Sequence, residues 1–274
     1  PPHPSPEPSI WGQNSSALQD WFANPLGAPF HDFAGSVVVH SMGGWLALPA
    51  VILIGPRMGR WVRGKSHAIP ISNIPFLALG SWILAVGWFG FNVMSAQNLN
   101  GISGLVAANS LLAMVGGVIF AVVATKCDPG FAHNGALAGL IAICAGSDLV
   151  HPFAAFLIGG LGALIFVYGF QWEQEILKID DVLGVWPLHG IIGTWGGISA
   201  GIFGYTELGG LGGVSFMAQL AGSMFAIIYA LITGFIVYSV IVKVFGFRLG
   251  DDEEFRGSDL AIHKIGSYPE DSVS

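Results

Sequence analysis

The chain has 274 residues, of which 53% are hydrophobic and only 10% are charged, with a formal net charge of −7. Soluble domains carry about a quarter charged residues, so this composition excludes an ordinary soluble domain and predicts an all-α polytopic membrane protein. The 40 glycines agree with this prediction, because small residues let transmembrane helices approach closely. No basic patch favours nucleic-acid binding, and two cysteines, Cys127 and Cys144, are too few for a disulfide framework.

The beginning of the chain differs from the rest in composition. The opening sequence PPHPSPEPS is rich in proline and also contains serine and glutamate, which is typical of an extended loop. It has no starting Met, no basic n-region and no apolar h-region, so it is not a signal peptide. We therefore expect the chain to be a fragment of a longer protein.

Seven segments are apolar and long enough to be candidates for membrane-spanning helices, for which about 20 residues are needed. They are residues 33–55, 75–96, 101–125, 133–149, 152–172, 182–204 and 214–245. The fourth segment is short and glycine-rich, so hydropathy supports it least. The seventh is long enough to tilt or to project beyond the bilayer.

The ten Lys and Arg residues predict how these segments cross the membrane. They flank or follow the first, third, fifth and seventh segments, and they are Arg57, Arg60, Arg63, Lys65, Lys126, Lys178, Lys243, Arg248, Arg256 and Lys264. Cytoplasmic loops collect Lys and Arg. We therefore expect an extracytoplasmic loop over residues 1–31, a transmembrane domain over 32–246 and a cytoplasmic tail over 247–274, in a multi-pass protein of the cell (inner or plasma) membrane. An outside start without a signal peptide again suggests that earlier spans are missing.

The pattern Asp-x7-His occurs twice, as Asp32 to His40 in the first segment and as Asp181 to His189 in the sixth. The first segment is expected to enter from outside and the sixth from inside. Eight residues at a helical rise of 1.5 Å span about 12 Å, and half a hydrocarbon core is about 15 Å. Each histidine should therefore reach the middle of the membrane from its own face, as in an inverted-topology repeat with its site at the midplane.

Two other roles for the histidines stay open. Buried histidines can bridge helices by hydrogen bonds, although ionisable residues within a membrane are functional by default. A metal site usually needs three or four ligands, and no third ligand is expected nearby, because His151 belongs to the outer side and His67 and His133 to the inner side. We favour a paired functional role, and we expect no metal and no cofactor.

The aspartates of the two patterns have an expected structural role. A carboxylate in the first turn of a helix can accept hydrogen bonds from backbone N–H groups and meets the positive end of the helix dipole. Asp32 is predicted to cap the first segment in this way, and Asp180 and Asp181 the sixth. Asp32 can also help a cation to approach from outside.

The second segment ends in GWFGFNVMSA, residues 87–96. Phe91 and Ser95 are four residues apart and share a helix face near the outer end, with Trp88 one turn deeper. Such aromatic residues more often belong to packing or to an interfacial belt. The alternative is a cation site, because an aromatic face attracts a cation by roughly 0.5–2 kcal/mol and a serine hydroxyl can accept a hydrogen bond.

Four motifs that occur in order resemble the ammonium transporter family (Amt/Mep/Rh), on its Amt side. They are DFAGSVVVH, GWFGFN with a following serine, KIDDVLGVWPLHG and FRLGDDEEFRGSDLAIHKIGSYPED. The resemblance extends from about Trp11 to Glu270. It implies eleven spans, arranged as two inverted five-helix halves and a final long helix, in trimers with one pore per subunit. This chain would hold about seven of these spans, the fifth to the eleventh.

The resemblance also implies site residues near the outer end. Ser95 resembles a residue of the outer recruitment site, Phe91 one of two stacked gate phenylalanines and Trp88 a pore-lining tryptophan. Trp11 resembles the tryptophan of the recruitment site, although the loop that follows it is longer than the family usually has. The second gate phenylalanine would belong to the missing half.

His40 and His189 resemble the twin pore histidines of the family, and Asp32 resembles an aspartate needed for ammonium handling. The mechanism we expect is that ammonium, or methylammonium as its analogue, binds outside and loses a proton, and that ammonia then crosses a hydrophobic pore past the histidines. Neutral imidazoles offer one donor and one acceptor each, so a linked pair can relay the proton. Potassium has no proton to lose and is rejected by the cost of desolvation.

Three motifs depart from the family's pattern. The second aspartate of DDxxDV is Gly184 here, which leaves the Amt or Rh subgroup open. The usual Thr-Pro of the fourth segment is Cys144-Ala145, and the usual His-Gly of the tail is His263-Lys264.

Two further classes of function stay open. One is an ammonium sensor of the same fold with little or no conduction, and the acidic tail is consistent with a PII-type regulator as the soluble partner that the resemblance implies. The other is a membrane enzyme, which we do not expect, because the sequence has no nucleophile arrangement and no cluster of metal ligands. We therefore expect a transporter that is embedded in the lipid bilayer and forms a homotrimer.

Overall fold

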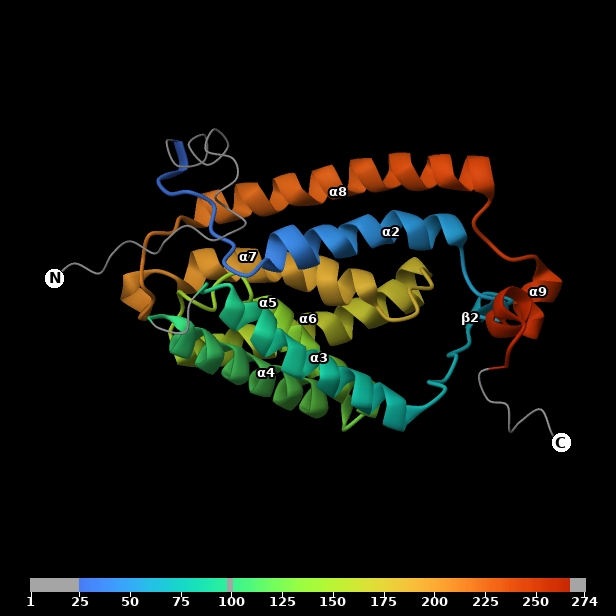
Figure 1. Cartoon of the computed structure of the whole chain (residues 1–274), viewed down its shortest axis with the longest axis horizontal. Helices are drawn as coiled ribbons and strands as arrows, with labels where there is room; N and C mark the ends of the chain where they lie inside the picture. Colours follow the sequence, from blue (N-terminus) through green and yellow to red (C-terminus); the bar gives the residue numbers. More distant parts are fainter. Residues whose placement is uncertain (1–24, 98–100, 267–274) are drawn as a thin grey trace.

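The structure is a computed structural model that describes residues 25–97 and 101–266, and its helices run side by side as a bundle (Figure 1). In chain order the elements are η1 (Ser36–Ser41), α2 (Met42–Ile54), β1 (Trp61–Val62), β2 (Lys65–Ser66), α3 (Ile74–Met94), α4 (Ser103–Thr125), α5 (Pro129–Ile143), α6 (Pro152–Trp172), η2 (Glu173–Leu177), η3 (Trp186–Ile191), α7 (Ile192–Phe203), η4 (Thr206–Leu208), α8 (Phe216–Phe245), α9 (Asp251–Arg256) and η5 (Asp259–His263). Four of the η segments are π-helical, and η4 is a short 3-10 helix. The described part of the chain is therefore all-α apart from the short antiparallel pair β1–β2.

Polar side chains fix where several helices begin. The side chains of Asn73, Asp128 and Ser215 each accept a hydrogen bond from a backbone N–H in the first turn of α3, α5 and α8. Pro129 follows Asp128 directly and occupies the first turn of α5, where its missing N–H costs nothing. These local signals explain why α5 begins at Pro129, four residues before the predicted start of the fourth segment.

Five described helices are long and apolar enough to cross a membrane, judged by length and composition. They are Ser36–Ile54, Ile74–Met94, Ser103–Thr125, Pro152–Leu177 and Phe216–Phe245. The other two predicted segments are shorter helices: α5 has 15 residues, and α7 has 12 and is preceded by η3. A helix of 15 residues is about 22 Å long, which is shorter than a hydrocarbon core of about 30 Å.

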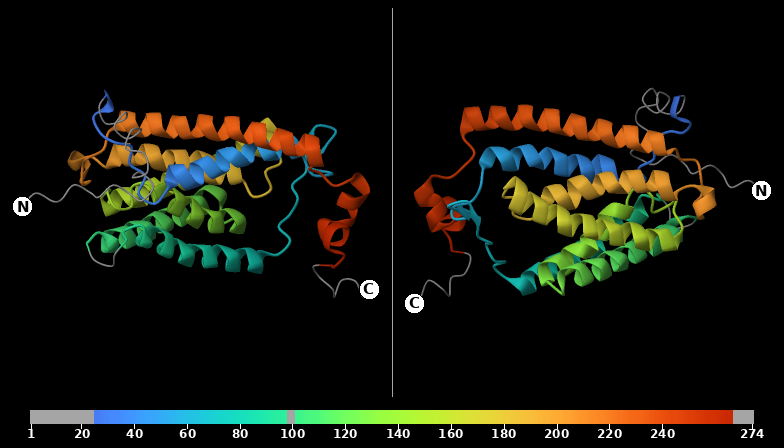
Figure 2. Two further views of the ribbon diagram at one scale, coloured as in Figure 1. Left: turned by 45° about the horizontal axis from the view of Figure 1, so that its top comes forward. Right: turned by 180° about the vertical axis from the view of Figure 1, so that it is seen from behind.

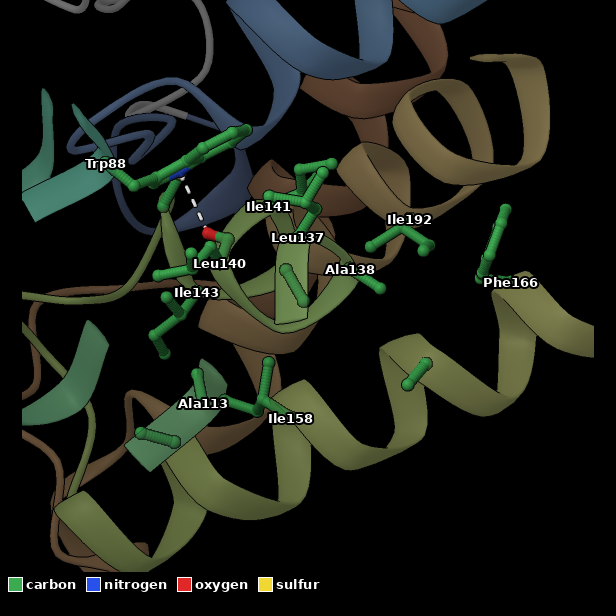
Figure 3. Close-up of a cluster of buried hydrophobic side chains, with 14 of the residues drawn as sticks. Trp88, Ala113, Leu137, Ala138, Leu140, Ile141, Ile143, Ile158, Phe166 and Ile192 are labelled. Atoms are coloured by element: carbon green, nitrogen blue, oxygen red, sulfur yellow. Dashed lines mark hydrogen bonds between the residues drawn. The ribbon is translucent and has the colours of Figure 1, made fainter. Parts of the chain in front are cut away.

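The helix α5 is the centre of the hydrophobic core. Its residues from Gly135 to Ile143 are all buried. Figure 3 shows Leu137 and Ile141 of α5 among Ile158 of α6, Ile192 of α7 and Trp88 of α3. Because its neighbours cover α5 on all sides, it does not need the length of a helix that faces lipid.

The outer helices expose large apolar side chains instead. On α3, Trp82, Ile83 and Val86 are more than half exposed, and on α8 the same holds for Ile228 and Ile232. In water such faces would be costly, whereas in a bilayer they contact hydrocarbon. This distribution and the five long apolar helices make the chain a multi-pass membrane protein.

Several basic residues gather at one end of the bundle. Both views of Figure 2 agree that α9 lies at the end of the bundle opposite to residues 25–35, with α8 running along the bundle between these ends. The strands β1 and β2 lie beside α9 (Figure 1). Arg60, Arg63 and Lys65 belong to this strand region, and Arg248 and Arg256 to the α9 region.

Candidate functional site

Two helices enter the bundle from opposite ends and cross near its middle. The first is η1 with α2, and the second is η3 with α7 (Figure 1). At the crossing their backbones touch, because a Cβ atom on Gly44 would collide with the backbone of Gly190. A Cβ on Gly193 would likewise collide with the backbone of Ser36 and Ser41. Only glycine permits this approach.

The close crossing brings His40 and His189 together. Their Nδ1 atoms are 3.3 Å apart, and their ring centroids are 5.4 Å apart. A bond between two Nδ1 atoms requires that one nitrogen carries the proton and the other accepts it. The outward nitrogen, Nε2, of the donating ring is then an acceptor, and that of the accepting ring carries a proton. The two rings exchange roles when the donating ring gains a proton at its Nε2, the shared proton moves to the other Nδ1, and the accepting ring releases the proton of its own Nε2.

Aromatic side chains from α3 line one side of His40. The indole of Trp88 stacks on the imidazole, with centroids 5.0 Å apart and an interplanar angle of 18°. Phe91 lies one turn further along α3, with its ring 5.7 Å from that of His40 and 6.2 Å from that of Trp88. His40 is 9% exposed, and its Nε2 has no hydrogen-bond partner among the described residues. The imidazole is therefore enclosed by rings and keeps one nitrogen available.

The two aspartates of the repeated pattern bind the beginnings of the π-helices. Asp32 accepts hydrogen bonds from the backbone N–H groups of Val37 at 3.0 Å and Val38 at 2.8 Å. Asp181 accepts one from the N–H of Trp186 at 2.7 Å. Both carboxylates are buried, and each satisfies donors that the first helical turn leaves free.

A glycine in the left-handed conformation follows each of these aspartates three residues later. Gly35 has φ +96° and Gly184 has φ +65°. A Cβ on Gly184 would also lie 2.5 Å from the ring of Phe170. The position where the family's pattern has a second aspartate is therefore one where this chain needs a glycine.

Asp180 does not cap the helix as predicted. It forms a two-pronged ion pair with Arg57, with both bonds at 2.8 Å.

The segment before Asp32 is fixed by contacts that the sequence did not predict. The Nε2 of His31 lies 3.0 Å from Oδ1 of Asp148. The backbone N–H and C=O of His31 bond to the side-chain amide of Gln219 at 2.7 and 2.6 Å. Burial alone would lower the pKa of His31, but the carboxylate of Asp148 outweighs it, so the net shift is upward.

Comparisons with known proteins identify the family of the chain. Residues 10–268 match the model of the Ammonium Transporter Family. The chain is 43% identical to the ammonium transporter Amt2 of Methanocaldococcus jannaschii over 92% of this chain and 61% of that protein, and 37% identical to Amt1 of the same organism over 98% and 67%. The chain belongs to the ammonium transporter family. It thus spans between three fifths and two thirds of the length of these two relatives.

Solved structures of the same family share the fold. A structure described as a sensor Amt protein has a TM-score of 0.79 and 32% identity, over 88% of this chain and 62% of that chain. Mep2 from Candida albicans has a TM-score of 0.75 and 25% identity, over 92% and 59%. The fold predicted from the motifs is confirmed at this level.

The remaining predicted site residues of this family member lie in different places. Ser95 follows the last residue of α3, and its hydroxyl donates to the backbone oxygen of Phe91 at 3.0 Å. Trp11 lies outside the described residues. The contact between His31 and Asp148 was missed, because no local pattern links residues so far apart in the sequence.

Proposed function

We propose that this protein takes part in the transport of ammonium or ammonia across the cell membrane, and that His40 and His189 are its central site. The observation that carries this proposal is the 3.3 Å contact between the two imidazoles, which belong to helices that start at opposite ends of the bundle. The family membership and the names of the archaeal relatives support it. The chain is proposed to act as a transporter and not as an enzyme.

The proposed mechanism separates the proton from the cation. Moving a bare ammonium ion into a low-dielectric interior costs many kcal/mol, whereas ammonia is neutral and much cheaper to move. Ammonia crosses past the two imidazoles. The proton given up by ammonium enters at Nε2 of the donating ring, the shared proton moves to the other Nδ1, and the accepting ring releases its Nε2 proton on the far side. Potassium cannot follow this route because it has no proton to give up.

The outer end of the site is proposed to recruit and gate the cation. Phe91 and Trp88 present ring faces beside His40, which favour a cation or its neutral product. Ser95 lies one turn beyond Phe91 and supplies a hydroxyl. Trp11, which is outside the described residues, is assigned to recruitment from the family resemblance alone. Asp32 holds the first π-helix in register and adds negative charge on the outer side.

The orientation in the membrane is proposed from the distribution of basic residues, and the partners from the tail and the family resemblance. The basic strand region and α9 would face the cytoplasm, and residues 1–31 the outside. At the inner end Glu254 accepts a hydrogen bond from the N–H of Met58 and pairs with Arg248, so the tail over 247–274 reaches the loop that follows α2. We propose a regulatory tail that binds a PII-type protein, in a homotrimer embedded in the lipid bilayer.

Uptake measurements on the histidine variants test the proposal. His40→Ala and His189→Ala, made separately and together, are compared with the unchanged chain for uptake of labelled methylammonium and for leakage of potassium in vesicles. We expect loss of methylammonium uptake or new potassium leakage. Unchanged uptake with unchanged selectivity contradicts the role of the histidines.

A second candidate function is favoured by one comparison. The solved structure with a TM-score of 0.79 is described as a sensor Amt protein. In that case the histidine site would bind ammonium without rapid passage, and the tail would transmit the signal. Ammonium binding by calorimetry together with absence of uptake by the unchanged chain favours the sensor, and concentration-dependent uptake favours the transporter.

A further inference from the structure

We infer that Cys144 is a positioning residue for the proposed transport site, because its thiol holds Trp88 against His40. Cys144 follows the last residue of α5 and is completely buried. The indole Nε1–H of Trp88 donates to the sulfur of Cys144 at 3.2 Å. Figure 3 shows Trp88 lying over this end of α5, beside Leu140. The inference rests on the proposed function for its consequence, but the bond itself can be tested separately.

The thiol belongs to a chain of hydrogen bonds that crosses three helices. Its sulfur lies 3.2 Å from Oδ1 of Asn92 on α3 and 3.1 Å from the backbone oxygen of Leu140 on α5, so the S–H can donate to either. The amide of Asn92 in turn donates to the hydroxyl of Ser110 on α4 at 2.9 Å. Asn92, Ser110 and Cys144 are each fully buried. In such a place polar groups are strongly constrained, because an unpaired one is costly.

The same residue also holds the segment that leads to His40. The backbone oxygen of Cys144 accepts the N–H of Ala34 at 2.8 Å, and the oxygen of Ala145 accepts the N–H of Phe33 at 3.1 Å. Cys144 therefore binds Trp88 through its side chain and, through its backbone, the segment that leads to His40. Only the contact with Trp88 depends on the chemistry of the side chain.

Removal of the thiol leaves the indole N–H of Trp88 buried without this acceptor. A lost hydrogen bond of ordinary strength changes an equilibrium about fivefold, so a population of Trp88 moves off the imidazole to find another partner. The indole of Trp88 stacks on the imidazole of His40, so its displacement changes the surroundings of that ring, and methylammonium is larger than ammonium. We therefore expect Cys144 to affect the discrimination between these two substrates.

The test compares a hydroxyl with an apolar group of similar shape. Cys144→Ser and Cys144→Thr keep an acceptor for the indole, whereas Cys144→Val removes it. Valine is bulkier than cysteine, so Cys144→Thr, which has the shape of valine, controls for the added bulk and should behave like Cys144→Ser. We expect Cys144→Val to lower uptake and to change the ratio of methylammonium to ammonium uptake about fivefold, and Cys144→Ser to stay within about twofold of the unchanged chain. Cys127→Ala is the control, because Cys127 is exposed and its φ of +69° would strain a β-branched residue; it should change nothing.

A second readout keeps the inference independent of transport. In protein labelled with 15N-tryptophan, the Trp88 indole signal is assigned by its loss in Trp88→Phe, and its hydrogen exchange is measured. We expect slow exchange in the unchanged chain and in Cys144→Ser, and exchange at least about fivefold faster in Cys144→Val. Equal exchange in Cys144→Val and the unchanged chain overturns the inference. If the exchange result holds but the unchanged chain shows no uptake, the transport proposal fails and the positioning bond stands.

Discussion

The segments from Asp32 to Ser41 and from Asp181 to Ile191 have the same local construction at opposite ends of the bundle. In each, an aspartate is followed after three residues by a left-handed glycine and after eight by a histidine, and the histidine belongs to a π-helix. Such π-helical turns frequently occur at functional sites.

Their surroundings differ. His31, which precedes Asp32, is held by Asp148 in the link between α5 and α6 and by Gln219 of α8. The residue before Asp181 is paired with Arg57, at the inner end as proposed. One local pattern therefore builds both halves of the central site, whereas the residues that hold each half in place differ between the two ends.

Adding one methyl group at the crossing should have the largest effect. Gly44→Ala places a Cβ against the backbone of Gly190, so the two helices must separate. Overpacking of this kind costs up to about 3 kcal/mol, and more where backbone must move. We expect a large fall in thermal stability, measured by size exclusion after heating, and separation of the two histidines.

Gly43→Ala is the control for the crossing, because a Cβ there meets no atom within 4 Å. We expect it to be neutral or slightly stabilising, since alanine favours helix more than glycine does. Equal stability of the two variants would contradict the close crossing.

The two capping aspartates should contribute similarly if the two halves are equivalent. Asp32→Ala and Asp181→Ala each leave backbone N–H groups of a π-helix without their acceptor, which costs about 1–2 kcal/mol. Asparagine at either position should recover most of the loss. The comparison is broken if one alanine variant matches the unchanged chain in thermal stability while the other unfolds.

The pair of His31 with Asp148 should make the stability of the Asp32 end, but not that of the Asp181 end, depend on pH. The net upward shift of the His31 pKa means that the folded protein binds this proton more tightly than the unfolded chain. Its stabilisation is complete below the ordinary pKa of about 6.5 and is lost as the pH rises through the raised value. In His31→Gln the melting temperature should therefore fall less between about pH 5.5 and pH 9 than in the unchanged chain.

His67→Gln is the matched control for this pH effect, because His67 is exposed. It should keep the pH dependence of the unchanged chain. A pH dependence that survives in His31→Gln would show that another group causes it.

The contact of the tail should have the smallest effect. Glu254→Gln weakens a partly exposed pair with Arg248, and such pairs contribute about 0.5 kcal/mol. We expect little change in melting temperature but faster cleavage of the chain after Arg248 in limited proteolysis. Cleavage at the unchanged rate would mean that the tail does not depend on this contact.

Much of the arrangement follows from local patterns, and the rest depends on distant neighbours. Hydropathy and the spacing Asp-x7-His predicted a membrane bundle and the meeting of His40 with His189. The fourth segment was predicted to be short, but its place at the centre of the core, where its neighbours bury it, was not predicted. The bonds of His31 and Cys144 join residues more than fifty positions apart, and no periodicity in the sequence reports such contacts.

The proton relay between the imidazoles is tested most directly by a double-mutant comparison of transport. Ammonium-driven current is measured in liposomes containing the unchanged chain, His40→Ala, His189→Ala or both changes. If the shared proton carries the reaction, the two histidines act as a unit, so each single variant should lose nearly as much current as the double variant. Losses that simply add, or a single variant with full current, would contradict the relay.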